Sequence, residues 1–186
     1  MNSDIQHLTV SDGVYPTRLV ERLGPEASPR LRLLGNPDLL GLPKTALFCS
    51  VRCPGNAILA AYDKAARWRD ERRCVISGFH SPVEKECLRI LLRGSPPTII
   101  CPARGLPRRI PAGWRKPLDE GGLLILSAFP EAETRITADL ARRRNDLVAA
   151  LADEVWFAHV TPGGNNDMLT GSLVRWRVPF STGKTS

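Results

Sequence analysis

The chain alternates short apolar runs with longer segments in which apolar residues recur every three or four positions. Mostly apolar runs of strand length occur at residues 45–49, 74–76, 98–101, 123–126 and 154–160. Helical spacing, which places apolar residues on one face, occurs at residues 58–68, 82–91, 136–151 and 168–176. A short extended stretch at residues 177–180 follows the last helical pattern.

Between Lys44 and Gly94 the order is strand, helix, strand, helix, which is typical of a βαβ crossover and of a parallel sheet covered on both faces. We therefore expect a three-layer α/β domain with a mostly parallel sheet of five to seven strands. Residues 1–40 differ, because the apolar residues around Leu19 and Leu33 need a surface to cover. We expect this segment to form a small N-terminal cap and residues 41–186 to form the three-layer domain.

In parallel sheets, ligands gather at the carboxyl ends of the strands, where the N–H groups of helix N-termini attract anions. Polar turns follow the first, second and fifth strand patterns, at residues 50–56, 77–82 and 161–167. The candidate binding residues in these turns are Ser50, Arg52, Ser77, Gly78, His80, Gly163 and Gly164.

These candidates also have purely structural interpretations. Arg52 can hold a phosphate through its planar fork, or it can lie unpaired on the surface. Ser77 and Gly78 suit anion contact, but a tight turn needs the same residue types. A histidine on a loop, such as His80, is usually only solvated. Glu84 is suited to cap backbone donors at the start of the second helix.

The net charge is +7, and the positive charges are clustered. This favours an anionic partner, although many basic proteins bind none. Residues 104–116 are the most basic stretch and are rich in Gly and Pro, which predicts a loop. Cations around Trp114 are typical of a groove for single-stranded nucleic acid; the alternative is a solvated loop with a core-facing tryptophan. The candidates here are Arg104, Arg108 and Arg109.

The sequence gives no support for a metal site, a membrane segment or a catalytic centre. Four of the five cysteines lie in or beside apolar runs, which predicts buried reduced thiols, and no C-x-x-C pair is present. No run of about eighteen apolar residues and no signal-peptide pattern occurs, so we expect a cytoplasmic protein without membrane contact. The nucleophile motif G-x-S-x-G is absent, and we expect neither catalysis nor a cofactor.

Six motifs follow one another in a specific order: Tyr15-Pro16, Leu33–Leu40, Arg52, Ser77-Gly78, Leu126–Pro130 and Arg143–Leu151. Their order and spacing resemble the Rossmann-like domain of the DNA-processing protein A (DprA/Smf) family, over roughly residues 15–180. The resemblance implies a Rossmann-like fold and a role in DNA uptake and recombination during natural transformation. It also implies single-stranded DNA and a recombinase as partners, and a homodimer. It aligns Arg144 and Asn145 with the family's arginine-asparagine pair.

The chain departs from the family pattern at both of the first two turns. The Ser50–Arg52 turn stands where the family usually has Gly-Ser-Arg, and Pro82, Glu84 and Leu88 replace a glycine, an aspartate and a histidine. These changes keep a second function open, a sensor or enzyme for a small nucleotide derivative in the same crevice. Nucleotide-cleaving relatives have the pattern Pro-Gly-Gly-x-Gly-Thr, and this chain lacks the Gly-Thr pair after Gly164. A binding protein is therefore favoured over an enzyme.

Overall fold

The computed structural model describes residues 5–183; residues 1–4 of the expected cap and residues 184–186 lie outside this range. The strands are β1 (Gln6–Thr9), β2 (Arg30–Gly35), β3 (Lys44–Cys49), β4 (Cys74–Ser77), β5 (Thr98–Ile100), β6 (Leu123–Ser127), β7 (Glu154–His159) and β8 (Phe180–Thr182). The helices are α1 (Thr17–Leu23), α2 (Gly55–Asp70), α3 (Pro82–Leu91), α4 (Ala112–Asp119), α5 (Ala138–Leu151) and α6 (Asn165–Trp176). Among the described residues, no helix is both long enough and apolar enough to cross a membrane.

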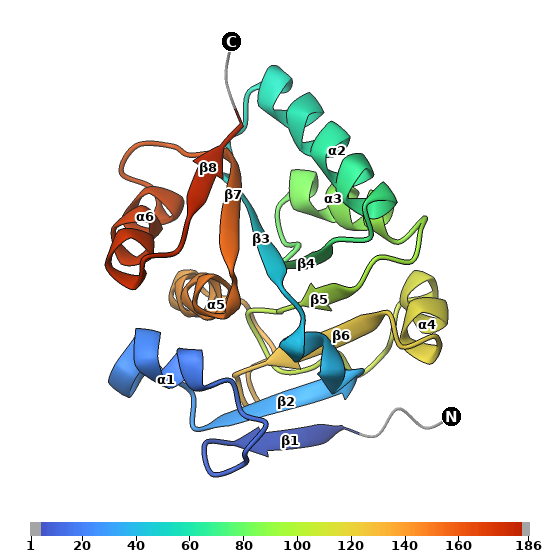
Figure 1. The fold of residues 1–186 in the computed structure, drawn as a ribbon, viewed down its shortest axis with the longest axis vertical. Coiled ribbons are helices and arrows are strands. Elements are labelled where there is room, and N and C mark those ends of the chain that lie inside the picture. The colour runs from blue at the N-terminus through green and yellow to red at the C-terminus, as the bar shows by residue number, and fades with distance from the viewer. Residues whose placement is uncertain (1–4, 184–186) are drawn as a thin grey trace.

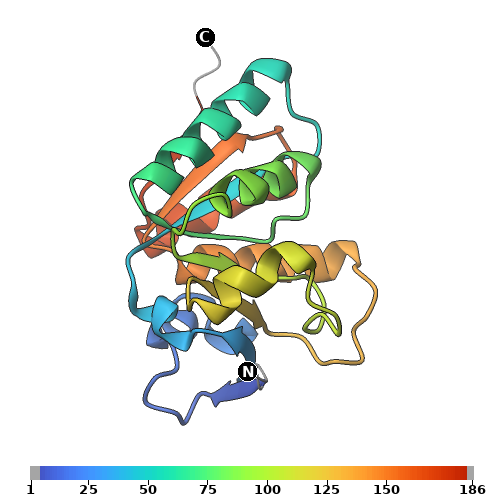
Figure 2. The ribbon, with the colours of Figure 1, turned by 90° about the vertical axis from the view of Figure 1, so that its right-hand side faces the viewer.

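The strands form one sheet in the order β1-β2-β6-β5-β4-β3-β7-β8 (Figure 1). Strands β3 to β8 run parallel, and β1 and β2 are antiparallel to their neighbours. Helices cover both faces of the sheet (Figure 2). The expected three-layer, Rossmann-like α/β architecture with a mostly parallel sheet is confirmed.

Two apolar cores lie on the two faces of the sheet. Helices α2, α3 and α4 pack on one face, and α1, α5 and α6 pack on the other. In β3, Ala46 and Phe48 point to the α5 side, while Leu47 and Cys49 point to the α2 side, as the alternation of a strand requires. Because both faces are covered, β3, β4, β5 and β6 are buried along their whole length.

The N-terminal segment extends the sheet as well as covering it. Strand β2 pairs with β6, and β1 pairs with β2. Helix α1 packs on α5, and its Leu19 is fully buried. The sheet has eight strands, more than the five to seven expected, because the edge strands β1 and β8 are short and carry little apolar signal.

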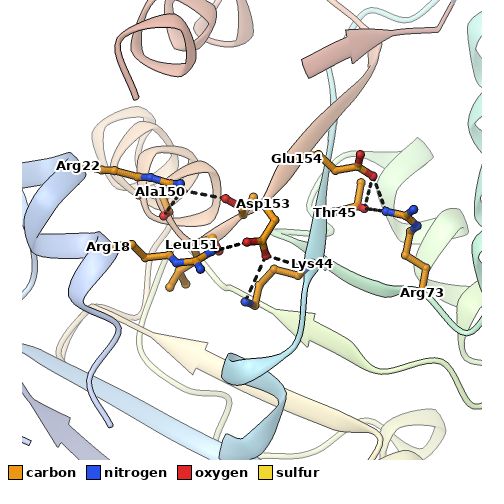
Figure 3. Close-up of polar contacts among 10 residues, drawn as sticks. Arg18, Arg22, Lys44, Thr45, Arg73, Ala150, Leu151, Asp153 and Glu154 are labelled. Carbon is orange, nitrogen blue, oxygen red and sulfur yellow. Dashed lines mark hydrogen bonds and ion pairs between the residues drawn. The ribbon is translucent and has the colours of Figure 1, made fainter. Parts of the chain in front are cut away.

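A polar network holds α1 near the amino-terminal ends of β3 and β7 (Figure 3). Arg22 donates from Nη1 to the carbonyl oxygens of Ala150 and Ala152, both at 2.8 Å. Arg18, one turn earlier, pairs with Asp153 at 2.9 Å. Cations suit this position, because the last carbonyls of α5 have no partner within the helix and carry the negative end of its dipole.

The same end of the sheet holds two further polar contacts. Lys44 is buried, its ammonium lies 3.8 Å from Asp153, and burial lowers its pKa. Thr45 donates to Glu154 at 2.6 Å and accepts from Arg73 at 2.7 Å. Side chains thus pair with one another at this end, and the opposite end of the sheet is where a ligand was expected.

The prediction of a loop over residues 104–116 is wrong for its second half. Residues 112–119 form helix α4, so the loop ends at residue 111. Trp114 and Leu118 lie four residues apart and pack on the α2-side core, so Trp114 has the core-facing role. Two prolines and two glycines in the predicted loop hid this helical spacing, because each is typical of a loop.

Candidate nucleic-acid interface

A pocket of about 320 Å³ lies where the turns after β3, β4 and β7 meet the N-termini of α3 and α6. This is the edge of the sheet at which a ligand was expected. Six of the candidate residues line it: Ser50, Arg52, His80, Arg144, Asn145 and Gly164. The other lining residues are Cys49, Val51, Ser81, Glu84, Ala141, Thr161, Asn165 and Asn166.

Arg144 forms the inner wall of the pocket, and only 5% of its surface is exposed. Its Nε donates to Oδ1 of Asn145 at 2.8 Å, and its Nη1 donates to the carbonyl of Cys101 at 3.3 Å. Nη2 has no acceptor among the described residues. Because every fully buried side-chain nitrogen of those residues has a hydrogen-bond partner, Nη2 is not fully buried. Nη2 therefore opens onto the pocket.

The charge of Arg144 is not neutralised by a contacting acid among the described residues. Burial lowers its pKa, while the nearby carboxylate of Glu84 favours the charged form. That carboxylate is occupied by backbone donors, accepting the N–H of Cys49 at 3.0 Å, of His80 at 2.9 Å and of Ser81 at 3.1 Å. Glu84 thus caps α3, as expected, and leaves the guanidinium available to an anion.

Gly78 and Ser77 shape the turn after β4. A Cβ at Gly78 would lie 1.5 Å from Nη1 of Arg144, so only glycine lets the guanidinium lie over this turn. Ser77 is fully buried, and its hydroxyl accepts the N–H of Phe79 at 3.2 Å. Neither residue lines the pocket.

Ser50 joins the end of β3 to the turn after β7. Its N–H donates to the carbonyl of His159 at 3.2 Å. Its Oγ accepts the N–H of Thr161 at 3.1 Å and the side-chain amide of Asn166 at 3.4 Å. Since both lone pairs are used, the hydroxyl proton is the part of Ser50 that can contact a ligand.

Arg52 lies exposed on the rim of the pocket and forms no hydrogen bond or ion pair with the described residues. Opposite it, α6 begins after Gly164, which offers no side-chain cap. The N–H groups of Asn165 and Asn166 have no protein acceptor within residues 5–183. They carry the positive end of the helix dipole and are available to an anion. Gly163 stays outside the pocket and donates its N–H to Asp167.

His80 is exposed on the turn before α3. Partial burial of its ring lowers its pKa, and the charges of Arg144, Lys85 and, more weakly, Arg104 lower it further, while the carboxylate of Glu84 acts in the opposite direction. Arg104 is therefore close enough to act on the pocket, although it does not line it. The turn after β4 lies in a positive electrostatic field.

The basic loop forms a separate cavity of about 420 Å³. Arg104, Arg108 and Arg109 line it together with Glu131 and Glu133. The loop is held in place by the N–H of Gly105, which donates to the carbonyl of Glu133 at 2.9 Å. Of the twelve candidates, six therefore line the pocket and three line this second cavity, while Ser77, Gly78 and Gly163 line neither.

Sequence reasoning did not select Asn166, Thr161 or Ser81 as pocket residues. Asn166 is 7% exposed, and its burial depends on how α6 packs beside β7. Ser81 carried a readable signal, because Ser81 and Glu84 match the capping-box pattern that starts α3.

Solved structures of DNA processing protein A resemble this fold. DNA processing protein A from Streptococcus pneumoniae matches with a TM-score of 0.78 and 21% identity, over 98% of this chain and 64% of that one. DNA processing protein A from Helicobacter pylori, whose structure concerns its single-stranded DNA binding mode, matches with a TM-score of 0.76 and 20% identity, over 100% of this chain and 84% of that one. This chain thus spans 64% of the length of the pneumococcal protein. At these identities the matches establish the fold.

A search of curated protein sequences returns no significant match. The profile of the family described as DNA recombination-mediator protein A matches residues 6–162, which include every strand from β1 to β7 and the turns after β3 and β4. The match covers most of the chain and agrees with both solved structures. The chain therefore belongs to the DNA recombination-mediator protein A family.

Proposed function

We propose that this chain binds single-stranded DNA without catalysing a reaction, and that it acts in DNA recombination and uptake. The observation that carries the proposal is Arg144, a buried guanidinium with one nitrogen open to the pocket and no contacting acid among the described residues. A buried charge without a paired anion is costly, and a bound phosphate supplies that anion.

The other residues have distinct proposed roles around this arginine. Arg52 on the rim grips a second phosphate through its planar fork. The hydroxyl of Ser50 and the amide of Asn145 contact the strand, and the free N–H groups of α6 face its negative charge. Gly78 keeps space for Arg144. Arg104, Arg108 and Arg109 extend the positive surface beyond the pocket.

Single strands suit this arrangement better than duplexes. The pocket is small, and its cations lie at different depths, so a flexible backbone can bend in where a stiff duplex cannot. The contacts are to phosphates, which carry no sequence information, so we expect little sequence preference. The net charge of +7 speeds association with DNA.

The wider proposals follow from the family. We propose a homodimer that delivers single-stranded DNA to a recombinase during natural transformation. We propose a cytoplasmic location, which agrees with five free thiols, four of them buried. We also propose that residues 1–40 act as a cap on the domain formed by residues 41–186.

Titration of fluorescent oligo-dT at 50 and 200 mM NaCl tests the function. With about four phosphate contacts, affinity should fall roughly fiftyfold between these salt concentrations, because counterion release dominates the binding of single strands. A duplex of the same length and a panel of mononucleotides serve as competitors. Absent binding at low salt, or binding that does not change with salt, contradicts the proposal. Strong competition by a mononucleotide alone would favour the small-nucleotide function instead.

A further inference from the structure

Three cysteines gather beneath the turn that carries Arg52. Cys49 ends β3 and lines the pocket, and Cys87 is fully buried on α3. Cys53 lies in the turn itself, half-buried, and packs against the core that contains the other two. Among the five free thiols, Cys53 is the one that solvent reaches.

Cys49 and Cys53 are the pair best placed to react with each other. Burial, followed by the neighbouring Cys53 thiol, raises the pKa of Cys49. The Cys49 thiol is directed toward the turn, where it donates to the carbonyl of Ser50 at 3.4 Å. Cys87 is directed elsewhere, because its thiol donates to the carbonyl of Ala61 on α2 at 3.6 Å.

We propose that Cys49 and Cys53 are a dithiol whose oxidation to a disulfide displaces Arg52 and weakens DNA binding. The two residues enclose Ser50, Val51 and Arg52, and both pack in the core on the α2 side of the sheet. The proposal about binding rests on the proposed function, whereas the formation of the disulfide does not.

The reaction balances with hydrogen peroxide as the oxidant. The Cys53 thiolate attacks one peroxide oxygen, the O–O bond breaks, and the products are a sulfenic acid and water once the leaving hydroxide takes up a proton. The Cys49 sulfur then attacks the Cys53 sulfur, so the S–S bond forms and the S–O bond breaks. The second water leaves with the proton of Cys49. The two sulfurs lose two electrons, and peroxide is reduced to two waters.

The anchoring of Ser50 decides which part of the turn moves. Ser50 is held from the β7 side by Thr161 and Asn166, so the first half of the turn is fixed. A disulfide requires its two Cα atoms to lie about 4.4–6.8 Å apart with the sulfurs in a defined torsion. We expect closure to draw Cys53, the less buried of the two, toward Cys49, and the adjacent Arg52 to move with it away from the rim.

Tryptic mapping of the peroxide-treated native protein tests the bond directly. Trypsin cuts after Lys44, Arg52 and Lys64, so the expected disulfide joins peptide 45–52 to peptide 53–64. A bond between Cys53 and Cys87 would instead join peptide 53–64 to peptide 86–89. We expect the first species, its loss on adding dithiothreitol, and about a fivefold weaker Kd for oligo-dT while it is present.

Cys53→Ser is the matched control, because the residue is half-buried and the change is small. This variant should bind oligo-dT like the reduced protein and should not respond to peroxide. Recovery of only over-oxidised Cys53, or of the 53–87 bond, overturns the proposal. Formation of the 49–53 bond without a change in Kd also overturns it. If the reduced protein does not bind oligo-dT at all, the proposed function fails. The disulfide-linked peptide is a separate readout, and its absence shows that the Cys49–Cys53 bond does not form.

Discussion

Arg52 and Arg144 carry the same charge in opposite surroundings. Arg52 is exposed and unpaired within residues 5–183, so we expect it to contribute little to folding and, under the proposed function, to binding. Arg144, on α5, is buried against the turn after β4, and two of its nitrogens already donate to protein acceptors. Substitutions at Arg52 are therefore the cleaner test of the pocket.

Replacement of Arg52 should lower DNA affinity without lowering stability. Arg52→Ala should weaken binding by about 1.5–3 kcal/mol, as for the loss of a charged hydrogen bond. Arg52→Lys keeps the charge but loses the planar fork, so affinity should also fall clearly. Titration with oligo-dT and a thermal melt measure the two effects.

Arg108→Ala is the control for charge alone. Arg108 lies in the cavity of the basic loop, outside the pocket. Its loss should reduce affinity mildly and flatten the salt dependence by about one phosphate contact. If Arg52→Lys and Arg108→Ala behave alike, the pocket is not the binding site and a diffuse basic surface is.

Gly78→Ala should damage the site through Arg144. The added methyl group would lie 1.5 Å from Nη1, so the guanidinium must move or the turn must shift. We expect a loss of about 1–3 kcal/mol of stability, typical of overpacking, together with weaker oligo-dT binding. Gly171→Ala on α6 is the control, because nothing lies within 4 Å of its added Cβ and alanine favours a helix. Unchanged binding in Gly78→Ala would show that the position of Arg144 does not matter.

The pH dependence of binding should follow His80. Its pKa is lowered from the usual 6.5, by burial first and then by neighbouring cations. A bound phosphate offsets those cations and favours the imidazolium, so affinity should rise as pH falls from 7 toward 5. Free of ligand, the protein should lose a little stability over the same fall, since a lowered histidine pKa favours the unfolded state once that state is protonated. His80→Gln should remove most of the pH dependence of Kd, and an unchanged profile would contradict this role.

At the scale of elements, the two ends of the parallel sheet differ in how many of their polar groups are already paired. The carboxyl ends of β3, β4 and β7 leave the N-terminus of α6 and the cations Arg52 and Arg144 open to a ligand. The amino ends of β3 and β7 are closed by paired charges, and there Arg18 and Arg22 fasten α1 to the end of α5 (Figure 3). Stability and binding should therefore respond to different substitutions.

Arg22→Ala should lower stability and leave DNA affinity unchanged. It removes two charged hydrogen bonds to the last carbonyls of α5, which should cost about 1–3 kcal/mol and lower the Tm. Arg30→Ala, an exposed arginine on β2, is the control and should change the Tm little. A fall in oligo-dT affinity for Arg22→Ala at a temperature where the protein is folded would show that the two ends are coupled.

At the scale of the whole molecule, the sheet makes most thiols inaccessible. Cys49, Cys74 and Cys101 lie in or directly after central strands, and burial raises the pKa of Cys74 to about 11 and of Cys101 to about 12. They should resist alkylation in the native state and react only on unfolding, while Cys53 reacts first. Mass spectrometry after increasing times of alkylation measures the extent of modification at each cysteine. Equally fast labelling of all five cysteines would contradict the packing described.

The sequence alone determined the parts of the fold that depend on local pattern. The runs at β3, β4, β6 and β7 and the start of α3 at Pro82 are visible because central strands are uniformly apolar and helices repeat their apolar face. Helix α4 and strand β1 were missed, and the extended stretch expected at residues 177–180 overlaps only the first residue of β8, because prolines and short polar segments mask the same signals. The pocket as a region could also be foreseen, since parallel strands place their carboxyl turns along one edge.

Only the tertiary structure decided which candidates share that pocket, which of them are buried and which are paired with an acid. Apart from the family resemblance, which aligned Arg144, nothing in the sequence distinguishes Arg142, Arg143 and Arg144. In the fold, the first pairs with Asp139 and Asp146, the second lies over the ring of Phe129, and the third is buried against Gly78. The helical rotation of α5 against the β4 turn makes this choice. Burial and charge pairing arise from residues far apart in the chain, and no local pattern encodes them.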